Sequence, residues 1–273
     1  MRKLRWTLLV FLVNLIALPG FSASGAPTVG REITVAAAAD LNSALTEIAA
    51  GFKKQTGITV KLSFGASEAL AQQIQNGAPF DLFFSADMDY PRQLADAGQA
   101  EASSLYRYAI GGLVLWVPAD SLLDVEHKGM NVLTDPAIKK IAIANPQHAP
   151  YGRAAVAAMK HVQLYDLVSD RLVMGENVSQ AAQFVESGNA QVGFVALAHI
   201  TSPAIEGKGR YWQIPAEAYP PLEQGLVIIS RSRHKKQAAA FVEYIKTAES
   251  AKVLSRYGFG LPAQAPKRAS LTR

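Results

Sequence analysis

Two stretches of this chain decide its fold: ITVAAAADLNSAL (residues 33–45) and KLSFGASEALAQQI (residues 61–74). In each, an apolar run typical of a buried strand passes directly into a helical pattern, and a polar residue, Asp40 or Ser67, lies at the turn. The first turn of a helix has unpaired backbone N–H groups and a partial positive charge, so it favours an anion. Two such turns in one lobe indicate a receptor for a small oxyanion rather than an enzyme.

Strand and helix patterns alternate along most of the chain. Strands are predicted at Ile33–Ala38, Thr59–Ser63, Leu82–Ser85, Gly112–Val117, Ile141–Ala144, Arg171–Met174, Val192–Ala196 and Gly225–Ser230. Helices are predicted at Asn42–Thr56, Glu68–Asn76, Met88–Ala97, Gly152–Val162, Ser179–Ser187 and Lys236–Tyr257. Strands separated by helices of this length predict an α/β fold of βαβ units with parallel sheet and a ligand site at the carboxyl ends of the strands.

Two apolar segments are long enough to pass from one lobe to another, namely Tyr108–Pro118 and Gln224–Ser230. We therefore expect residues 27–109 and 228–273 to form a discontinuous lobe 1, and residues 110–227 to form lobe 2. Two crossings make a hinge, and a ligand would lie in the cleft between the lobes. A single larger sheet is the alternative.

The first 26 residues have the pattern of a cleavable signal peptide. Arg2, Lys3 and Arg5 precede an apolar run from Trp6 to Leu18, and small residues follow up to residue 26. The apolar run is about 13 residues, whereas a membrane span needs about 20, so an uncleaved anchor is the alternative. The pattern predicts export to the periplasm.

Charge and cysteine usage narrow the class of protein further. The net charge is +5, and removing the three basic residues of the signal peptide leaves the mature chain near +2, so the charge does not indicate nucleic-acid binding. There is no cysteine, so a hydrophobic core must hold the exported chain together. This composition fits a Gram-negative periplasm.

Four predicted strand-to-helix junctions carry candidate binding groups: Asp40, Ser67, Tyr151 and the pair Asn177-Val178. Any one of them alone is more simply explained as a helix cap. Four at the same ends of parallel strands would surround an anion with hydroxyl and backbone donors. At about 1.5–3 kcal/mol for each charge-assisted hydrogen bond, five or six donors would leave the roughly 8 kcal/mol of a micromolar site.

Five segments of the chain together resemble the periplasmic molybdate-binding proteins, the solute receptors of molybdate ABC importers. They are ITVAAAADL, SFGASEALAQQIQNGAPFDLFFSAD (63–87), IAIANPQHAPYGRAA (141–155), GENVSQAAQFVESGNAQVGFVAL (175–197) and RYGFGLP (256–262). The resemblance implies a type II periplasmic binding protein fold that closes on molybdate or tungstate and delivers it to a membrane permease. It implies a monomer without enzymatic activity, cofactor or nucleic-acid partner.

The resemblance also implies which residues hold the oxyanion. Ser67 matches a serine that gives its hydroxyl and amide, and Tyr151 and Val178 match positions that give backbone N–H groups. Asp40 stands where many members have a serine, and Ala196 stands where some have a tyrosine that donates its phenol. Both are departures, and Tyr151 is expected to replace the lost phenol. The oxygens of the anion, rather than the metal, would contact the protein.

Asp40 is the most unusual of these positions, because an ionised carboxylate donates no hydrogen bond and repels a dianion. We expect its side chain to turn away and cap its own helix, leaving the backbone amide for the ligand. A protonated side chain or a different ligand are the alternatives. Asn42 and Ser43 would then supply the missing side-chain donor.

Three other functions compete with this interpretation. Gly65–Ala69 is close to the G-x-S-x-G elbow of a serine hydrolase that would use Ser67 with His148 or His161, but the last glycine is replaced by alanine and no HGGG-type loop is present. The histidines lack the spacing of a metal site. Another small oxyanion, such as sulfate, would use the same helix starts.

Overall fold

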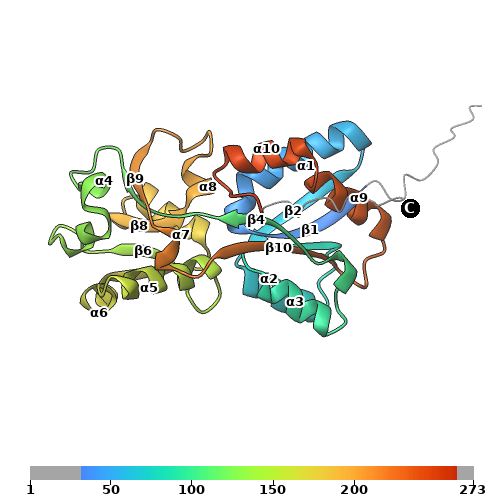
Figure 1. The fold of residues 1–273 in the computed structure, drawn as a ribbon, viewed down its shortest axis with the longest axis horizontal. Helices are drawn as coiled ribbons and strands as arrows, with labels where there is room; N and C mark the ends of the chain where they lie inside the picture. Colours follow the sequence, from blue (N-terminus) through green and yellow to red (C-terminus); the bar gives the residue numbers. More distant parts are fainter. Residues whose placement is uncertain (1–31, 263–273) are drawn as a thin grey trace, which may run out of the picture.

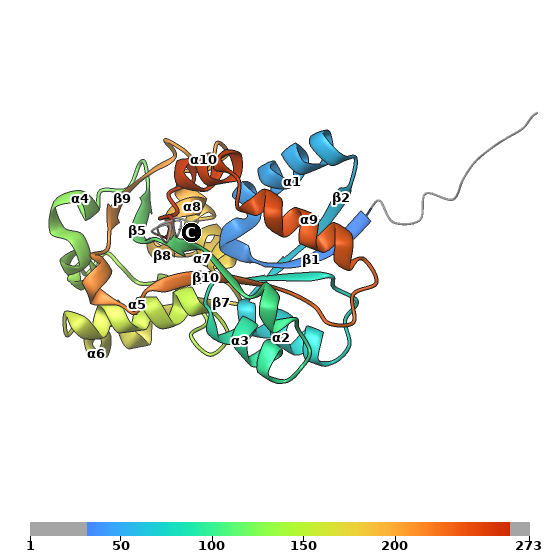
Figure 2. The same cartoon turned by 45° about the vertical axis from the view of Figure 1, so that its right-hand side comes forward.

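The computed structural model describes residues 32–262, which form two five-stranded sheets side by side (Figure 1). The strand order is β2-β1-β3-β10-β4 in the first sheet and β7-β6-β8-β5-β9 in the second. Helices cover both faces of each sheet, with α1, α9 and α10 opposite α2 and α3 on the first sheet (Figure 2). The predicted signal peptide, residues 1–26, lies outside the described residues.

The elements agree with the predicted ones within a few residues over most of the chain. The strands are β1 (Glu32–Ala38), β2 (Thr59–Gly65), β3 (Leu82–Ser85), β4 (Tyr106–Gly111), β5 (Leu113–Pro118), β6 (Ile141–Ala144), β7 (Leu172–Gly175), β8 (Val192–Ala196), β9 (Gly209–Gln213) and β10 (Leu222–Ile228). The helices are α1 (Asn42–Thr56), α2 (Ser67–Gln75), α3 (Asp89–Asp96), α4 (Val125–Lys128), α5 (Pro150–His161), α6 (Tyr165–Val168), α7 (Val178–Glu186), α8 (Leu197–Ile200), α9 (Lys235–Ile245) and α10 (Ala248–Arg256). A short 3-10 helix, η1 (Ala39–Leu41), leads into α1.

Both sheets are mixed, so the expectation of a parallel sheet was wrong for part of each. In the first sheet β1 is parallel to β2 and β3, but β10 is antiparallel to β3 and β4. In the second, β6 is parallel to β7 and β8, but β5 is antiparallel to β8 and β9. The antiparallel pairs involve β4, β5 and β10, which lie next to the two passages of the chain between the sheets and do not complete a βαβ crossover.

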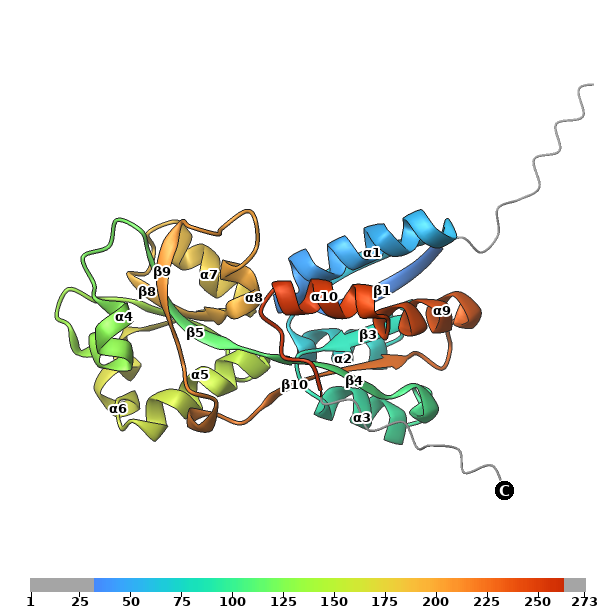
Figure 3. The same ribbon diagram turned by 45° about the horizontal axis from the view of Figure 1, so that its top comes forward.

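The chain passes between the two sheets twice. The first passage is the predicted one, although a break at Gly112 divides Tyr108–Pro118 into β4 in the first sheet and β5 in the second (Figure 3). The second passage is residues 214–221, and β10 lies entirely in the first sheet. Gln224–Ser230 is therefore not the crossing segment, and the predicted boundary at residue 228 falls at the end of β10 rather than before it.

One strand and one long helix also differ from the prediction. Strand β9, at an edge of the second sheet, has no counterpart among the predicted strands. The helix predicted over Lys236–Tyr257 is divided into α9 and α10, because Thr247 is in an extended conformation and its side chain accepts a hydrogen bond from the N–H of Ser250. Such a residue begins a new helix instead of continuing the old one.

The core of the first sheet shows how the chain is stabilised without cysteine. Phe241 of α9 lies against Phe52 of α1 and Phe84 of β3, with ring centroids 5.0 Å and 6.0 Å apart. On the opposite face Leu70 of α2 and Leu94 of α3 are buried against the same strands. Burying an apolar side chain of this size contributes about 1.5–3 kcal/mol. Within residues 32–262, no helix combines the length and the apolar composition that crossing a bilayer requires.

Candidate functional site

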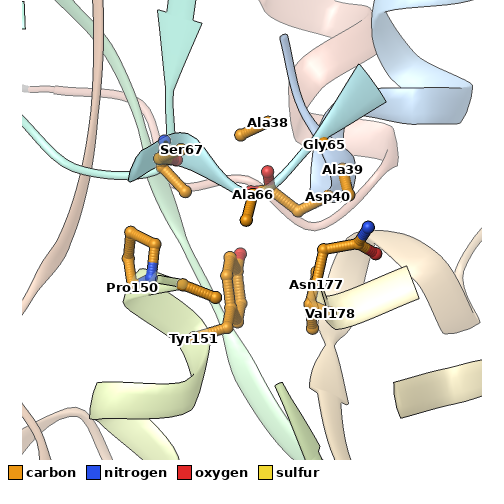
Figure 4. A pocket seen from close by; sticks show the side chains of 12 residues that line it. Ala38, Ala39, Asp40, Gly65, Ala66, Ser67, Pro150, Tyr151, Asn177 and Val178 are labelled. Atoms are coloured by element: carbon orange, nitrogen blue, oxygen red, sulfur yellow. Dashed lines mark hydrogen bonds between the residues drawn. The ribbon is translucent and has the colours of Figure 1, made fainter. Parts of the chain in front are cut away.

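A pocket of about 200 Å³, open solvent at its mouth included, lies between the two sheets (Figure 4). The first half of the chain provides residues after β1, β2 and β3, and the second half provides residues after β6 and β7. The pocket is lined by Ala38, Ala39, Asp40, Gly65, Ala66, Ser67, Ala86, Ala149, Pro150, Tyr151, Asn177 and Val178. Four of the five predicted oxyanion-binding residues are therefore brought together.

The register of the parallel strands explains why these turns meet. Ala38, the last residue of β1, pairs with Gly65, the last residue of β2, so the turns that follow are adjacent. Ala144 of β6 pairs in the same way with Gly175 of β7, and α5 and α7 begin shortly afterwards. The carboxyl ends of parallel strands thus face one another across the pocket, as the alternation of strands and helices predicted.

Three helices begin at the pocket. Ser67 is the first residue of α2, Val178 is the first residue of α7, and Tyr151 follows Pro150 at the start of α5. The first N–H groups of a helix have no acceptor within the helix and carry a partial positive charge. Proline fits the first position because its missing N–H is not needed there. The convergence favours an anion in the pocket.

Ser67 contributes a hydroxyl group as well as the start of a helix. Its Oγ accepts a hydrogen bond from the backbone N–H of Ala86 at 3.0 Å, and the residue is buried. Because a serine hydroxyl both donates and accepts, this bond occupies an acceptor site and fixes the position of Oγ. The hydroxyl hydrogen can then be donated to a ligand oxygen.

The remaining walls are small and carry no positive charge. Alanine and glycine supply half of the lining residues, and none of the twelve is lysine, arginine or histidine. Small side chains let an anion approach backbone N–H groups closely. The lining therefore offers hydroxyl and backbone groups to a ligand and no cationic side chain.

Asp40 does not cap its helix, so that expectation was wrong. A capping residue is extended and lies just before its helix, whereas Asp40 lies inside η1. Neither η1 nor α1 has a side-chain cap. Asp40 is 4% exposed, and neither carboxylate oxygen has a partner with the geometry of a hydrogen bond. Burial raises the pKa of Asp40 to about 7, although the neighbouring Tyr151 hydroxyl and Gln224 amide oppose part of the rise.

The Tyr151 side chain adds a group to the site that the sequence analysis assigned only through its backbone. Its hydroxyl is buried without a hydrogen-bond partner, and burial raises its pKa well above the usual value. The amide nitrogen of Gln224 in β10 is also buried and unpaired, while its oxygen accepts a 3.1 Å hydrogen bond from Tyr108 of β4. Gly111 leaves room for both, because a Cβ there would overlap the Tyr151 hydroxyl.

Gln224, Tyr108 and Gly111 were missed by the sequence analysis. The signal for Gln224 is a polar residue within an apolar strand, and that for Gly111 is a glycine pair at the chain crossing. Neither signal shows that the residues lie beside Asp40, because the contact joins strands more than 100 residues apart in sequence.

Polar contacts hold the two halves of the molecule together around the pocket. Nδ1 of His148 lies 2.9 Å from a carboxylate oxygen of Glu68, and Arg153 donates a 2.7 Å hydrogen bond to Asp87. The Ser179 hydroxyl donates a 3.1 Å hydrogen bond to the backbone oxygen of Ala39 in η1. These contacts join α5, α7 and the loop before α5 to the first sheet, so the structure has a closed arrangement.

Three residues named in the sequence analysis do not line the pocket. Ala196 is buried at the end of β8, where it pairs with Leu113. Asn42 and Ser43 lie in the first turn of α1, and neither faces the pocket. The donor that was expected from Asn42 or Ser43 is therefore not supplied by them.

The arrangement does not support the alternative of a serine hydrolase. The ring of His148 contacts Glu68 and not Ser67, and His161 is exposed at the far end of α5. Within residues 32–262 there is also no group of three or more potential metal-ligating side chains.

Comparisons with known proteins agree with the fold. A family model described as bacterial extracellular solute-binding protein matches residues 33–260. The molybdate-binding protein ModA of Azotobacter vinelandii is 37% identical over 250 residues, which is 92% of this chain and 98% of that protein. ModA of Rhodobacter capsulatus is 36% identical over 233 residues, which is 85% of this chain and 90% of that protein.

A solved structure gives the same result. The periplasmic molybdate-binding protein of Azotobacter vinelandii has a TM-score of 0.80 and 38% sequence identity, covering 84% of this chain and 99% of that one. The predicted class, an α/β periplasmic binding fold, is thereby confirmed. The chain belongs to the family of bacterial extracellular solute-binding proteins.

Proposed function

We propose that this protein is the periplasmic receptor of an ABC importer for molybdate, and that it also accepts tungstate. Its close relatives are solute-binding proteins and not enzymes. The observation that carries the proposal is the convergence of three helix starts and the Ser67 hydroxyl on one pocket without a cationic side chain. A tetrahedral dianion suits such a site, because its oxygens accept hydrogen bonds from several directions.

Each of the predicted site residues has a role in this proposal. Ser67 donates its hydroxyl, and the backbone N–H groups of Val178, Tyr151 and Asp40 are directed at the remaining oxygens. The protein makes no bond to the metal itself. Ala196 has no contact with the ligand, since it lies outside the pocket.

Binding and release follow from closure of the two halves. An open form captures the anion on one half, and the contacts between Glu68 and His148 and between Asp87 and Arg153 form when the halves close. The anion shifts the population toward the closed form because it contacts both halves only there. A monomeric closed receptor, exported through its signal peptide, would then be recognised by the membrane permease.

Titration of the purified mature chain with molybdate, tungstate, sulfate and phosphate tests the proposal. A ligand at one hundred times its Kd stabilises the folded state by about 2.7 kcal/mol, so molybdate and tungstate should each raise the Tm. Isothermal titration calorimetry should give one site per chain. A response to sulfate or phosphate alone would contradict the proposal and favour the receptor for another oxyanion.

A further inference from the structure

The least expected group in the pocket is the carboxyl group of Asp40. It is 4% exposed and lines the pocket, and among residues 32–262 neither oxygen has a partner with the geometry of a hydrogen bond. Figure 4 shows the Asp40 and Tyr151 side chains reaching into the pocket from opposite halves of the molecule. An ionised carboxylate in this position would be costly to bury and would repel a dianion. The acid form has neither disadvantage.

Within residues 32–262, no cation near Asp40 would hold it ionised. Its own element provides only backbone N–H groups at residues 40 and 41. The groups that face it from α5, β4 and β10 are Tyr151, Tyr108 and Gln224. Burial raises the pKa of both tyrosines well above their usual value, so both phenols are neutral. None of these groups supplies a positive charge to offset a carboxylate.

We propose that Asp40 binds the oxyanion as a neutral acid, donating its carboxyl O–H to a ligand oxygen, so that each bound dianion is accompanied by a proton on Asp40. This inference rests on the proposed function, because it assigns a specificity-determining role to a residue of the same pocket. The proton comes from solvent and stays on Asp40, and no covalent bond to the anion forms. The closed site then holds the dianion with a side-chain donor on each half: Ser67 and Asp40 on one, Tyr151 on the other.

The sign of the pH dependence follows from the position of the proton. In the closed arrangement without ligand, burial raises the pKa of Asp40 to about 7, and a dianion beside it raises the pKa further. The affinity is therefore fully present below pH 7 and falls as the pH rises above 7, because binding must then protonate an ionised Asp40 at a lower proton concentration. The loss should approach tenfold for each pH unit, with about a tenfold loss between pH 6 and pH 8.

Calorimetric titration with molybdate in buffers of different ionisation enthalpy measures the proton directly. The wild-type chain should take up about 0.1 proton per anion at pH 6 and about 0.9 at pH 8. Molybdate stays a dianion over this range, so the proton is bound by the protein.

Two variants separate the acid from the rest of the site. Asp40→Asn keeps the shape and a donor but cannot titrate, so its affinity should no longer depend on pH and its proton uptake should disappear. Asp40→Ser offers a smaller donor and should behave in the same way if the asparagine variant does not fold. Ser67→Ala should lower the affinity at every pH while the wild-type proton uptake remains.

The outcomes distinguish this inference from the proposed function. Binding of molybdate by the wild-type chain without proton uptake, and with equal affinity at pH 6 and pH 8, would overturn the inference but leave the function. Loss of binding in both Asp40→Asn and Asp40→Ser would show that the carboxylate itself is required and would also overturn it. If no tetrahedral oxyanion binds at any pH, the proposed function and the inference both fail.

Discussion

The hydroxyl group of Ser67 offers the sharpest test of how the pocket holds an anion. Ser67→Ala removes one charge-assisted hydrogen bond to the ligand, which is worth about 1.5–3 kcal/mol. The affinity for molybdate should therefore fall by a factor of about 10 to 150. The variant also removes the acceptor of the 3.0 Å bond from the Ala86 N–H, so the free energy of unfolding should fall by about 1–3 kcal/mol.

Ser250→Ala is the matched control for this experiment. Ser250 is as deeply buried as Ser67, and its Oγ donates a 2.7 Å hydrogen bond to the backbone oxygen of Tyr244, far from the pocket. It should lose stability without losing affinity. Calorimetric titration gives the affinity of both variants, and urea unfolding gives their stability. Wild-type affinity in Ser67→Ala, or an equal loss of affinity in both variants, would refute the reasoning.

Three further variants test the surroundings of the site. Gly111→Ala should lower the Tm and the molybdate affinity, because its Cβ overlaps the Tyr151 hydroxyl, and the free energy of unfolding should fall by about 1–3 kcal/mol. Gly260→Ala is the control, because its Cβ has contacts no closer than 3.5 Å. Arg153→Ala breaks a partly exposed bond between the two halves, so calorimetry should show at most about a fivefold weaker affinity, and a larger loss would contradict a minor role. Because the pKa of Asp40 is raised in the folded state, the stability of the wild-type chain without ligand should fall as the pH rises from about 4 to 7. The Tm of Asp40→Asn should therefore rise relative to that of wild type over this range. A constant difference between the two Tm values would contradict a buried acid at this position.

The sequence predicted the parts of the fold that local patterns control. The runs after residues 33 and 61 gave strand, turn and helix in the observed order, because apolar strands and amphipathic helices differ in periodicity. The mixed sheets were not predicted, because the direction of β10 relative to β3 depends on where the chain returns from the second sheet. That return is a long-range property with no local signal.

The site followed the same division. Ser67, Val178 and Tyr151 were placed correctly in the pocket because each follows a parallel strand, and the ends of such strands meet. The prediction for the Asp40 side chain was wrong, because it placed Asp40 just before the helix. The short helix η1 begins one residue earlier and includes Asp40. The buried cluster of Asp40, Tyr151 and Gln224 joins segments that are distant in sequence, so only the folded chain shows it.

A crystal structure of the purified chain grown with molybdate tests the central claim most directly. Anomalous scattering from the molybdenum locates the anion without ambiguity. We expect it between the two sheets, with its oxygens about 2.7–3.2 Å from the Ser67 hydroxyl and from the backbone nitrogens of Tyr151 and Val178. Molybdenum located elsewhere, for example in the surface pocket lined by Arg231 and Arg233, would contradict the account.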